Sequence, residues 1–334
     1  MKKKESKILI GADIGGSHIT CMAVNPVDHS IIKELVVRKE VNSQADAGAI
    51  LSAWSSALSE LIGMIGLGNL AGIGFAMPGP FDYPGGIAWF KGVKKFDSLY
   101  GINIRQELKQ RLNLSESVPV RFINDATAFA IGEAWIGKAA GFKRSMAITL
   151  GTGFGSAFIS EGIPVISGDE VPQDGCVWHI PYGKSIANDY FSTSWFVDRY
   201  KELTDKKISG VKEIIEELSN TTVQHPESKI ENRKSSIKHP LSSIQHLVSS
   251  LFHEFGTNLG TFLAPWLNIF QAGCLVIGGN IANGISYFEG PLKTALSGGN
   301  CNIPVFISEL GELAAIAGAA RLCDDDFYKE IPKY

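Results

Sequence analysis

The stretch that decides the fold is residues 7–24, KILIGADIGGSHITCMAV. Two segments rich in Ile and Val, Lys7 to Ile14 and Ile19 to Val24, predict antiparallel strands. Gly15-Gly16-Ser17 lies between them and predicts a tight turn, because glycine adopts turn conformations that other residues avoid. With a further strand expected over Ile31 to Val37, the chain opens as a set of antiparallel strands joined by a glycine hairpin.

The same layout returns in the second half of the chain. Ser145 to Leu150 predicts a strand, Gly151-Thr152-Gly153 a turn, and Gly155 to Ile159 a second strand. This repetition indicates an internal duplication within a mixed α/β fold.

Helical and strand patterns alternate along the rest of the chain. From Ser43 to Ile65 the apolar residues keep the three- and four-residue spacing of one helix face, which predicts a helix packed on the core. Further strands are expected over Leu70 to Met77, Val120 to Ile123 and Cys274 to Ile277, and further helices from near Asp125, over Ser242 to Leu267, after Gly278-Gly279-Asn280 and over Gly311 to Leu322.

The length of 334 residues suits two domains. We expect an N-terminal α/β lobe over residues 1–124, completed by a C-terminal helix at about residues 311–323, and a C-terminal α/β lobe over residues 125–310. Residues 201–240 form an insertion in the second lobe, in which 15 of 40 residues are charged. Few large apolar residues follow Leu218, so this insertion is expected to be a helical excursion followed by a mobile loop.

Composition limits the partners and the location of the protein. A hydrophobic fraction of 45% and a formal net charge of -3 are typical of a soluble globular protein and give no reason to expect nucleic acid binding. Asp13 interrupts the apolar stretch after the early lysines, and no later stretch approaches the ~20 apolar residues of a membrane span. We therefore expect a cytoplasmic protein without a signal peptide or membrane anchor, and a homodimer.

The five cysteines predict neither disulfides nor a zinc site. They are far apart, odd in number and without any Cys-x-x-Cys pair, so we interpret them as small buried residues in a reducing compartment. No structural zinc is expected. The cysteines are Cys21, Cys176, Cys274, Cys301 and Cys323.

Asp13 and the first glycine turn are the first candidates for chemistry. Asp13 ends a strand, where its carboxylate could hold magnesium directly or through water. The glycines of residues 15–18 would let backbone N–H groups approach a phosphate closely, although a plain tight turn has the same pattern. The second turn, Gly151-Thr152-Gly153, favours the functional interpretation, because two facing glycine turns would clamp a polyphosphate.

Two further candidates follow buried strands. Gly278-Gly279-Asn280 leaves room for a flat ligand such as adenine with its ribose, although an ordinary strand-to-helix turn has the same composition. Asn124 and Asp125 place an amide beside a carboxylate and precede small residues. A helix cap is the alternative interpretation of Asp125.

Together these motifs resemble those of the repressor, open reading frame and kinase (ROK) family of sugar kinases. The resemblance runs from Ile8 to Leu322. It implies a two-domain ribonuclease-H-like (actin/hexokinase) ATPase fold with duplicated mixed sheets flanked by helices, and an ATP- and magnesium-dependent hexose kinase with glucose as the expected sugar. The motifs, in the family's order, are Asp13-Ile14-Gly15-Gly16-Ser17, Pro78-Gly79-Pro80, Asn124-Asp125-Ala126, Gly151-Thr152-Gly153-Phe154-Gly155 and Gly278-Gly279.

The resemblance also implies a role for each motif. Asp13 would bind magnesium, Asn124 would bind sugar hydroxyls, and Asp125 would be the catalytic base that accepts the proton of the attacking hydroxyl. The residues implied to bind ATP are Gly15, Gly16, Ser17, His18, Gly151, Thr152, Gly153, Gly278, Gly279 and Asn280.

The sequence departs from the family where the sugar is bound. ROK kinases usually carry Gly-Glu-x-Gly-His and then a cysteine-rich zinc loop, and this chain lacks the zinc cysteines. We match Glu170 to the family glutamate and Gln173 to its histidine, while residues 188–189 fall near a later glutamate. Cys176 with His179 is at most half a metal site, and His179 is interpreted as a structural or sugar-contacting residue. The expected sugar-binding residues are Pro78, Gly79, Asn124, Asp125, Glu170, Gln173, His179, Asn188 and Asp189.

Two alternatives to a hexose kinase stay open. A sugar-responsive regulator or a catalytically weak kinase relic would fit the divergent sugar loop, although Asp13, Asn124 and Asp125 are all retained. The first strand begins near Lys7, which leaves no room for an N-terminal helix-turn-helix and disfavours a DNA-binding regulator. An acetate- or glycerol-type kinase would fit the phosphate turns but would fit the Pro78 and Asn124 motifs less well.

Overall fold

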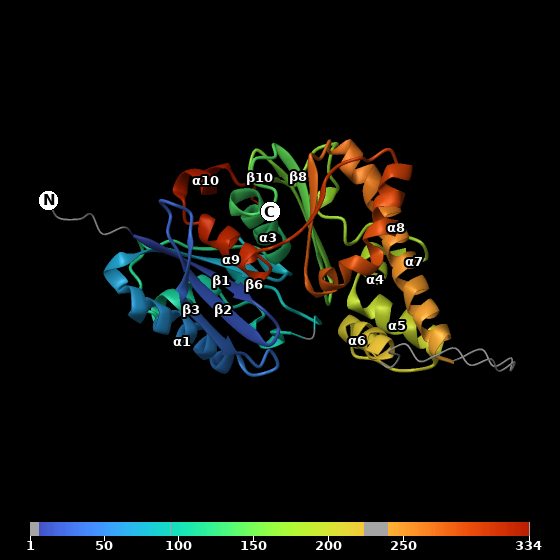
Figure 1. The fold of residues 1–334 in the computed structure, drawn as a ribbon. Helices are drawn as coiled ribbons and strands as arrows, with labels where there is room; N and C mark the ends of the chain where they lie inside the picture. The colour runs from blue at the N-terminus through green and yellow to red at the C-terminus, as the bar shows by residue number, and fades with distance from the viewer. Residues whose placement is uncertain (1–6, 94, 224–239, 334) are drawn as a thin grey trace, which may run out of the picture.

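Two five-stranded sheets form the centres of two lobes that lie side by side (Figure 1). The computed structural model describes residues 7–93, 95–223 and 240–333. The strands of the first sheet are β1 (Ile8–Ile14), β2 (His18–Val24), β3 (Ile31–Glu40), β4 (Leu70–Met77) and β7 (Val120–Asn124), and those of the second are β8 (Arg144–Leu150), β9 (Phe154–Ser160), β10 (Ile163–Val165), β13 (Cys274–Gly278) and β14 (Val305–Ile307).

Both sheets have the same topology. The first has the order β3-β2-β1-β4-β7, in which β1 pairs antiparallel with β2 and parallel with β4. The second has the order β10-β9-β8-β13-β14, in which β8 pairs antiparallel with β9 and parallel with β13. The predicted duplication of mixed sheets is therefore confirmed. Two short hairpins stand apart from the sheets, β5 (Phe81–Asp82) with β6 (Ile87–Ala88) and β11 (Pro181–Tyr182) with β12 (Ser185–Ile186).

Helices flank the sheets and connect the lobes (Figure 1). The α-helices are α1 (Ala47–Ile65), α2 (Ile104–Arg111), α3 (Asp125–Ile136), α4 (Ala187–Tyr190), α5 (Thr193–Thr204), α6 (Val211–Val223), α7 (Pro240–Ile269), α8 (Ile285–Gly298), α9 (Glu312–Arg321) and α10 (Asp325–Glu330). Short 3₁₀ turns are η1 (Leu67–Asn69), η2 (Asp97–Leu99), η3 (Gln173–Gly175) and η4 (Asn280–Gly284).

Helix α1 buries one face in the core of the first lobe. Asp46 caps it, since its Oδ1 atom accepts a hydrogen bond from the N–H of Ala49 at 2.9 Å, and the helix therefore begins after the expected Ser43. Trp54 and Leu58 are fully buried in this core. In length and hydropathy α1 would suit a membrane span, and it is the one such helix among the described residues. Its packed face makes it a core helix.

The charged insertion begins as expected with a helical excursion. Helix α6 covers Val211–Val223, and its Val211 and Ile214 are buried in the core of the second lobe. The segment predicted to be a mobile loop falls mainly on residues 224–239, which lie outside the described residues. The expected helix over Ser242 to Leu267 is the longer α7.

Helix α9 lies between the lobes and touches both through glycines (Figure 1). A Cβ atom on Gly132 of α3 would lie 1.9 Å from the carbonyl oxygen of Ala314 in α9. A Cβ atom on Gly74 of β4 would lie 1.7 Å from the carbonyl oxygen of Ala319. The first sheet and α3 therefore approach α9 at backbone distance, which only glycine permits.

We expect Gly132→Ala to lower the free energy of unfolding by about 1–3 kcal/mol. The added methyl group would clash with the backbone of α9, and a side-chain rotation cannot relieve a clash with backbone atoms. Gly63→Ala in α1 is the matched control, since nothing lies within 4 Å of its added Cβ atom. The control should stabilise the protein by about 0.5–1 kcal/mol through helix propensity. Chemical denaturation of both variants measures the difference, and equal effects would contradict the backbone contact.

Candidate active site

The first glycine turn, residues 15–18, follows the end of β1. The N–H of Gly15 donates to the carbonyl oxygen of His18 at 2.9 Å, and the carbonyl oxygen of Ser17 accepts from the N–H of Val41 at 2.8 Å. The N–H groups of Gly16 and Ser17 donate to no protein acceptor in the described part of the chain. Neighbouring free N–H groups in a turn can bind an anion.

The second turn, Gly151-Thr152-Gly153, joins β8 to β9. The N–H of Gly151 donates to the carbonyl oxygen of Gly153 at 3.0 Å, and Thr193 fixes the turn by donating its N–H and its hydroxyl to the carbonyl oxygen of Gly151 at 2.8 and 2.9 Å. Over the residues that the structure describes, the N–H groups of Thr152 and Gly153 have no protein acceptor. The two turns therefore offer the same kind of anion site.

Gly278 and Gly279 end β13 beside this second turn. A Cβ atom on Gly279 would lie 2.3 Å from the carbonyl oxygen of Leu150, and one on Gly278 would lie 2.4 Å from the ring of Phe129 in α3. Gly279 also has a φ of 86°, in the left-handed region. Close packing therefore explains both glycines. The pairing of β13 with β8 also places these two glycines, and Asn280 at the start of η4, next to the end of β8 that leads into the second turn.

Asn124 and Asp125 lie where β7 ends and α3 begins. Asn124 caps α3, because its Oδ1 atom accepts from the N–H of Ala126 at 3.0 Å and of Thr127 at 3.2 Å. Asp125 is the first residue of the helix, and its Oδ1 atom accepts from the N–H of Ala126 at 2.8 Å. The cap of this helix is thus Asn124 and not Asp125, which corrects the alternative interpretation of Asp125.

Tyr83 supports Asn124 from the first lobe. Its hydroxyl accepts from Nδ2 of Asn124 at 3.4 Å and donates to the carbonyl oxygen of Met77 at 3.2 Å. A Cβ atom on Gly79 would lie 3.5 Å from the same hydroxyl. The Pro78-Gly79 turn is therefore a neighbour of Asn124, as its expected sugar-binding role requires.

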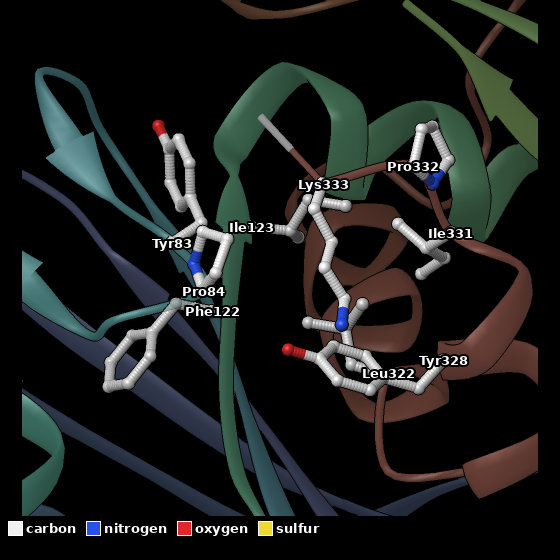
Figure 2. A pocket seen from close by; sticks show the side chains of 9 residues that line it. All are labelled: Tyr83, Pro84, Phe122, Ile123, Leu322, Tyr328, Ile331, Pro332 and Lys333. Carbon is white, nitrogen blue, oxygen red and sulfur yellow. The ribbon is translucent and has the colours of Figure 1, made fainter.

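A small pocket lies beside Tyr83, between β7 and the C-terminal residues. Its volume is about 20 Å³, room for one water molecule and too small for a hexose. Figure 2 shows the side chain of Lys333 extending across it toward the ring of Tyr328. None of the residues expected to bind nucleotide lines it, so this pocket is not the candidate site. Its lining is Tyr83, Pro84, Phe122, Ile123, Leu322, Tyr328, Ile331, Pro332 and Lys333.

Carboxylates of three elements interact at the candidate site. Burial, together with the charges of Asp125 and Glu312, raises the pKa of Asp13 to about 7, while Arg38 acts to lower it. Burial also raises the pKa of Asp125, against the hydrogen bond from Ala126 that lowers it. Many protein atoms lie near the Asp125 carboxyl, yet the residue as a whole is exposed to solvent, so a ligand can reach it. The structure therefore brings Asp13 and Asp125, 112 positions apart in the chain, into one electrostatic site.

Asp13 fits a magnesium ion that arrives with a nucleotide. The described residues contain no group of three or more carboxylate, histidine or cysteine side chains that could hold a metal on their own. Magnesium usually needs only one or two protein carboxylates, because phosphates and waters supply the other ligands. Asp13 lies at the end of β1, three residues before Gly16, and can supply such a carboxylate.

Asn188 joins the expected sugar loop to the second turn. Its Oδ1 atom accepts from the N–H of Phe154 at 3.0 Å, and its own N–H donates to the carbonyl oxygen of Trp178 at 2.9 Å. His179 follows Trp178 directly, and the two rings lie edge to face at 5.3 Å. His179 and Asn188 are therefore neighbours of the expected phosphate site.

Cys176 is next to His179 but is not a good zinc ligand. Its Sγ atom lies 3.8 Å from Nδ1 of His179, and burial raises the pKa of the thiol to about 11. The expected absence of structural zinc stays a prediction. Asp189, also expected at the site, is exposed and accepts a hydrogen bond from the hydroxyl of Ser185, next to Asn188.

Glu170 and Gln173 lie away from these residues. The carboxylate of Glu170 pairs with Arg144 at 2.5 Å, at the first residue of β8, whereas Gly151 follows the last. The strand between them spans roughly 20 Å. Gln173 is exposed at the start of η3. The structure therefore does not bring Glu170 to Asn124 and Asp125. The match to the family motif that suggested Glu170 carries no information on which end of β8 this residue meets.

Lys95 belongs to the site although the sequence analysis did not single it out. Its Nζ atom lies 3.0 Å from the position that a Cβ atom of Gly16 would take, and its charge lowers the pKa of Asp125. It lies in the loop between β6 and α2. A lysine in such a loop has no distinguishing pattern, so only the tertiary contact could have identified it.

Comparison with known proteins identifies relatives. A model of the ROK family matches residues 9–190. The chain is 30% identical to a glucokinase of Thermotoga maritima over 155 residues, which cover 46% of this chain and 45% of the relative. It is 24% identical to an N-acetyl-D-glucosamine kinase of Haemophilus influenzae over 232 residues, which cover 62% and 69%. The match thus spans under half the length of the first relative.

A solved structure extends the likeness to nearly the whole chain. The ROK family glucokinase of Streptomyces griseus in complex with glucose and AMPPNP has a TM-score of 0.66 at 20% identity, covering 94% of this chain and 98% of that one. At this identity the likeness concerns the fold alone. It confirms the expected two-lobe ribonuclease-H-like (actin/hexokinase) fold.

The raised pKa of Asp13 predicts a pH-dependent stability. Asp13 titrates at about pH 7 in the folded protein but at 3.8 in the unfolded chain, so the folded state holds the extra proton between these values. Its contribution to stability is therefore present below about pH 4 and is lost as the pH rises through 7. Without nucleotide or divalent ions, we expect Asp13→Asn to be more stable than the wild type at pH 8, on the order of 1 kcal/mol or more.

Thermal melts across this pH range test the expectation. The advantage of Asp13→Asn should shrink as the pH falls toward 4. The exposed Asp169 gives the matched control, Asp169→Asn. An Asp13→Asn variant that loses stability at pH 8 would show that the charged carboxylate is favourably paired in the folded protein.

Proposed function

The chain belongs to the ROK family, and from that premise we propose that it is an ATP-dependent sugar kinase. In this proposal it transfers the γ-phosphoryl group of ATP to a hydroxyl of a free hexose. Both nucleotide and sugar appear in the structure of the related glucokinase, which motivates the pair of substrates for this chain. The expected cytoplasmic location and homodimer stay predictions.

One observation carries the proposal, the position of Asp125 between the two glycine turns. A Cβ atom on Gly155, the second residue of the strand that follows the second turn, would lie 2.7 Å from the Cβ atom of Ala126, the residue after Asp125. On the other side, the charge of Asp125 acts on Asp13 at the end of β1, close to the first turn. A polyphosphate bound to the free N–H groups of both turns would therefore have its reacting end near the Asp125 carboxylate.

The mechanism follows from this placement. The carboxylate of Asp125 accepts the proton of the attacking sugar hydroxyl as the sugar oxygen forms a bond to the γ-phosphorus. The bond from this phosphorus to the bridging oxygen breaks, and ADP leaves with the electron pair. The raised pKa of Asp125 lies closer to neutral pH than that of an ordinary aspartate, which makes its carboxylate a more effective base. Magnesium held by Asp13 would neutralise charge on the phosphate oxygens.

In this proposal the sugar is bound by the expected site residues of both lobes. Asn124 precedes it, the Pro78-Gly79 turn lies by Tyr83, and Asn188 with His179 approach from the second lobe. Amide, imidazole and carboxylate groups suit the hydroxyls of a hexose. We propose glucose as the preferred sugar, supported by the name of the Thermotoga maritima relative, while the Haemophilus influenzae relative favours an N-acetylated amino sugar.

A panel of hexoses in a coupled ADP-release assay tests the activity, and Asp125→Asn tests the base. We expect this substitution to lower kcat by about 10²–10⁴-fold, because the amide cannot accept the proton. The affinity for sugar and the melting temperature should change little, since Asn124 and not Asp125 caps the helix. Asp28→Asn, in the exposed turn between β2 and β3, is the control.

Near-normal turnover of Asp125→Asn on the best sugar would remove Asp125 as the base. A wild-type protein that binds a hexose but turns none over would favour the sugar-responsive regulator.

Kinetics can distinguish His179 from Glu170 as the residue that binds the sugar. We expect His179→Ala to raise the KM for sugar by roughly tenfold or more, with little effect on the KM for ATP, as expected when a substrate hydrogen bond is lost. Glu170→Gln should leave both KM values near those of the wild type, because its partner is Arg144 at the far end of β8. The opposite pattern would restore Glu170 as the sugar ligand.

A further inference from the structure

Lys95 packs directly on the first glycine turn. Its side-chain atoms Cδ, Cε and Nζ lie 3.1, 2.9 and 3.0 Å from the position that a Cβ atom of Gly16 would take. The ammonium group therefore stands over the part of the turn whose N–H groups are free. Figure 1 shows the loop between β6 and α2 on the side of the first lobe that faces the second.

The next residue anchors Lys95 to the core. Phe96 is fully buried, with its ring centre 5.4 Å from that of Trp54 and 5.6 Å from that of Phe90. Its N–H donates to the carbonyl oxygen of Ser43 at 2.8 Å. Its φ of 60° lies in the left-handed region, which is unfavourable for a bulky side chain and persists only where the surroundings fix it. The position of Lys95 is therefore set by packing and not by chance.

The charge of Lys95 is available for a ligand. Arg38, whose charge acts on Asp13, already pairs with Glu312 at 3.0 Å. Lys95 forms no ion pair with a carboxylate within the ranges that the structure describes, yet its field reaches Asp125. It is thus a cation between the expected phosphate turn and the expected base.

We propose that Lys95 is a further catalytic residue, which binds the γ-phosphoryl group while it passes from ATP to the sugar. The proposal rests on the kinase function proposed above and adds a residue that lies outside all five glycine, proline and aspartate motifs of the sequence. The ammonium group donates hydrogen bonds to the non-bridging oxygens of the γ-phosphoryl group. These bonds remain as the bond to the sugar oxygen forms, the bond to the bridging oxygen of ADP breaks, and Asp125 takes the hydroxyl proton.

The test compares Lys95→Met with Lys91→Met, which removes the same charge from the same loop. Lys91 is a suitable control because its Nζ atom lies 5.5 Å from the ring centre of the exposed Tyr100, not on the glycine turn. We expect Lys95→Met to lower kcat by roughly 10- to 100-fold, which is somewhat less than the fall in kcat when a buried hydrogen-bond donor is removed from an active site. Lys95→Arg should recover part of the lost activity. Lys91→Met should keep the wild-type kcat.

Two further measurements distinguish catalysis from structure. Calorimetry with inorganic tripolyphosphate should show about tenfold weaker binding for Lys95→Met than for Lys91→Met, at equal melting temperatures. The acidic limb of the pH profile of kcat/KM should move to higher pH in Lys95→Met, because the charge that lowers the pKa of Asp125 is gone.

The outcomes separate this proposal from the kinase function. If the wild type phosphorylates no hexose, the kinase function fails, and the tripolyphosphate comparison still decides whether Lys95 binds phosphate. If Lys95→Met matches Lys91→Met in both tripolyphosphate affinity and kcat, Lys95 has no part in phosphate binding and the proposal is overturned.

Discussion

The backbone packing of α9 is the constraint on which the rest of the structure depends. Gly132 of α3 and Gly74 of β4 let α9 lie against both, with no side chain between them. Because packed interiors tolerate little added volume, these contacts fix α3 and the first sheet to the same helix. Asp13 is the last residue but one of β1, a strand of that sheet, and Asp125 begins α3. The relative placement of the two carboxylates therefore depends on these glycine contacts.

Much of this arrangement could be predicted from local patterns. The strand, glycine turn and strand of each half are predictable within a residue or two, since Ile and Val runs with glycine between them allow few other structures. The start of α3 near Asp125 is predictable in the same way, but the residue that caps it is not. Asn and Asp are about equally good caps, so only the hydrogen bonds of Asn124 could decide.

The parts that could not be predicted depend on contacts between distant segments. Glu170 matches the glutamate of the family motif, but Arg144 holds it at the far end of β8. His179 and Asn188 meet the second turn through Trp178 and Phe154, a path with no signature in any short motif. Room for a ligand is one reason for glycine at positions 278 and 279. Close packing against Phe129 and the backbone of Leu150 is already a sufficient reason. One chain alone cannot separate glycines needed for packing from glycines needed for binding.

The anchoring of Phe96 connects the hydrophobic core to chemistry at the surface. The residue has an unfavourable backbone conformation because its ring occupies a place between Trp54 of α1 and Phe90. A smaller side chain at Trp54 would leave the Phe96 ring less tightly packed and would let the backbone of Phe96 relax to an ordinary conformation. The side chain of Lys95, the preceding residue, would then leave the glycine turn. A substitution in the buried face of α1 can therefore change the position of Lys95 at the first glycine turn. Such a variant can have the kinetics of an active-site mutant although the substituted residue touches no ligand.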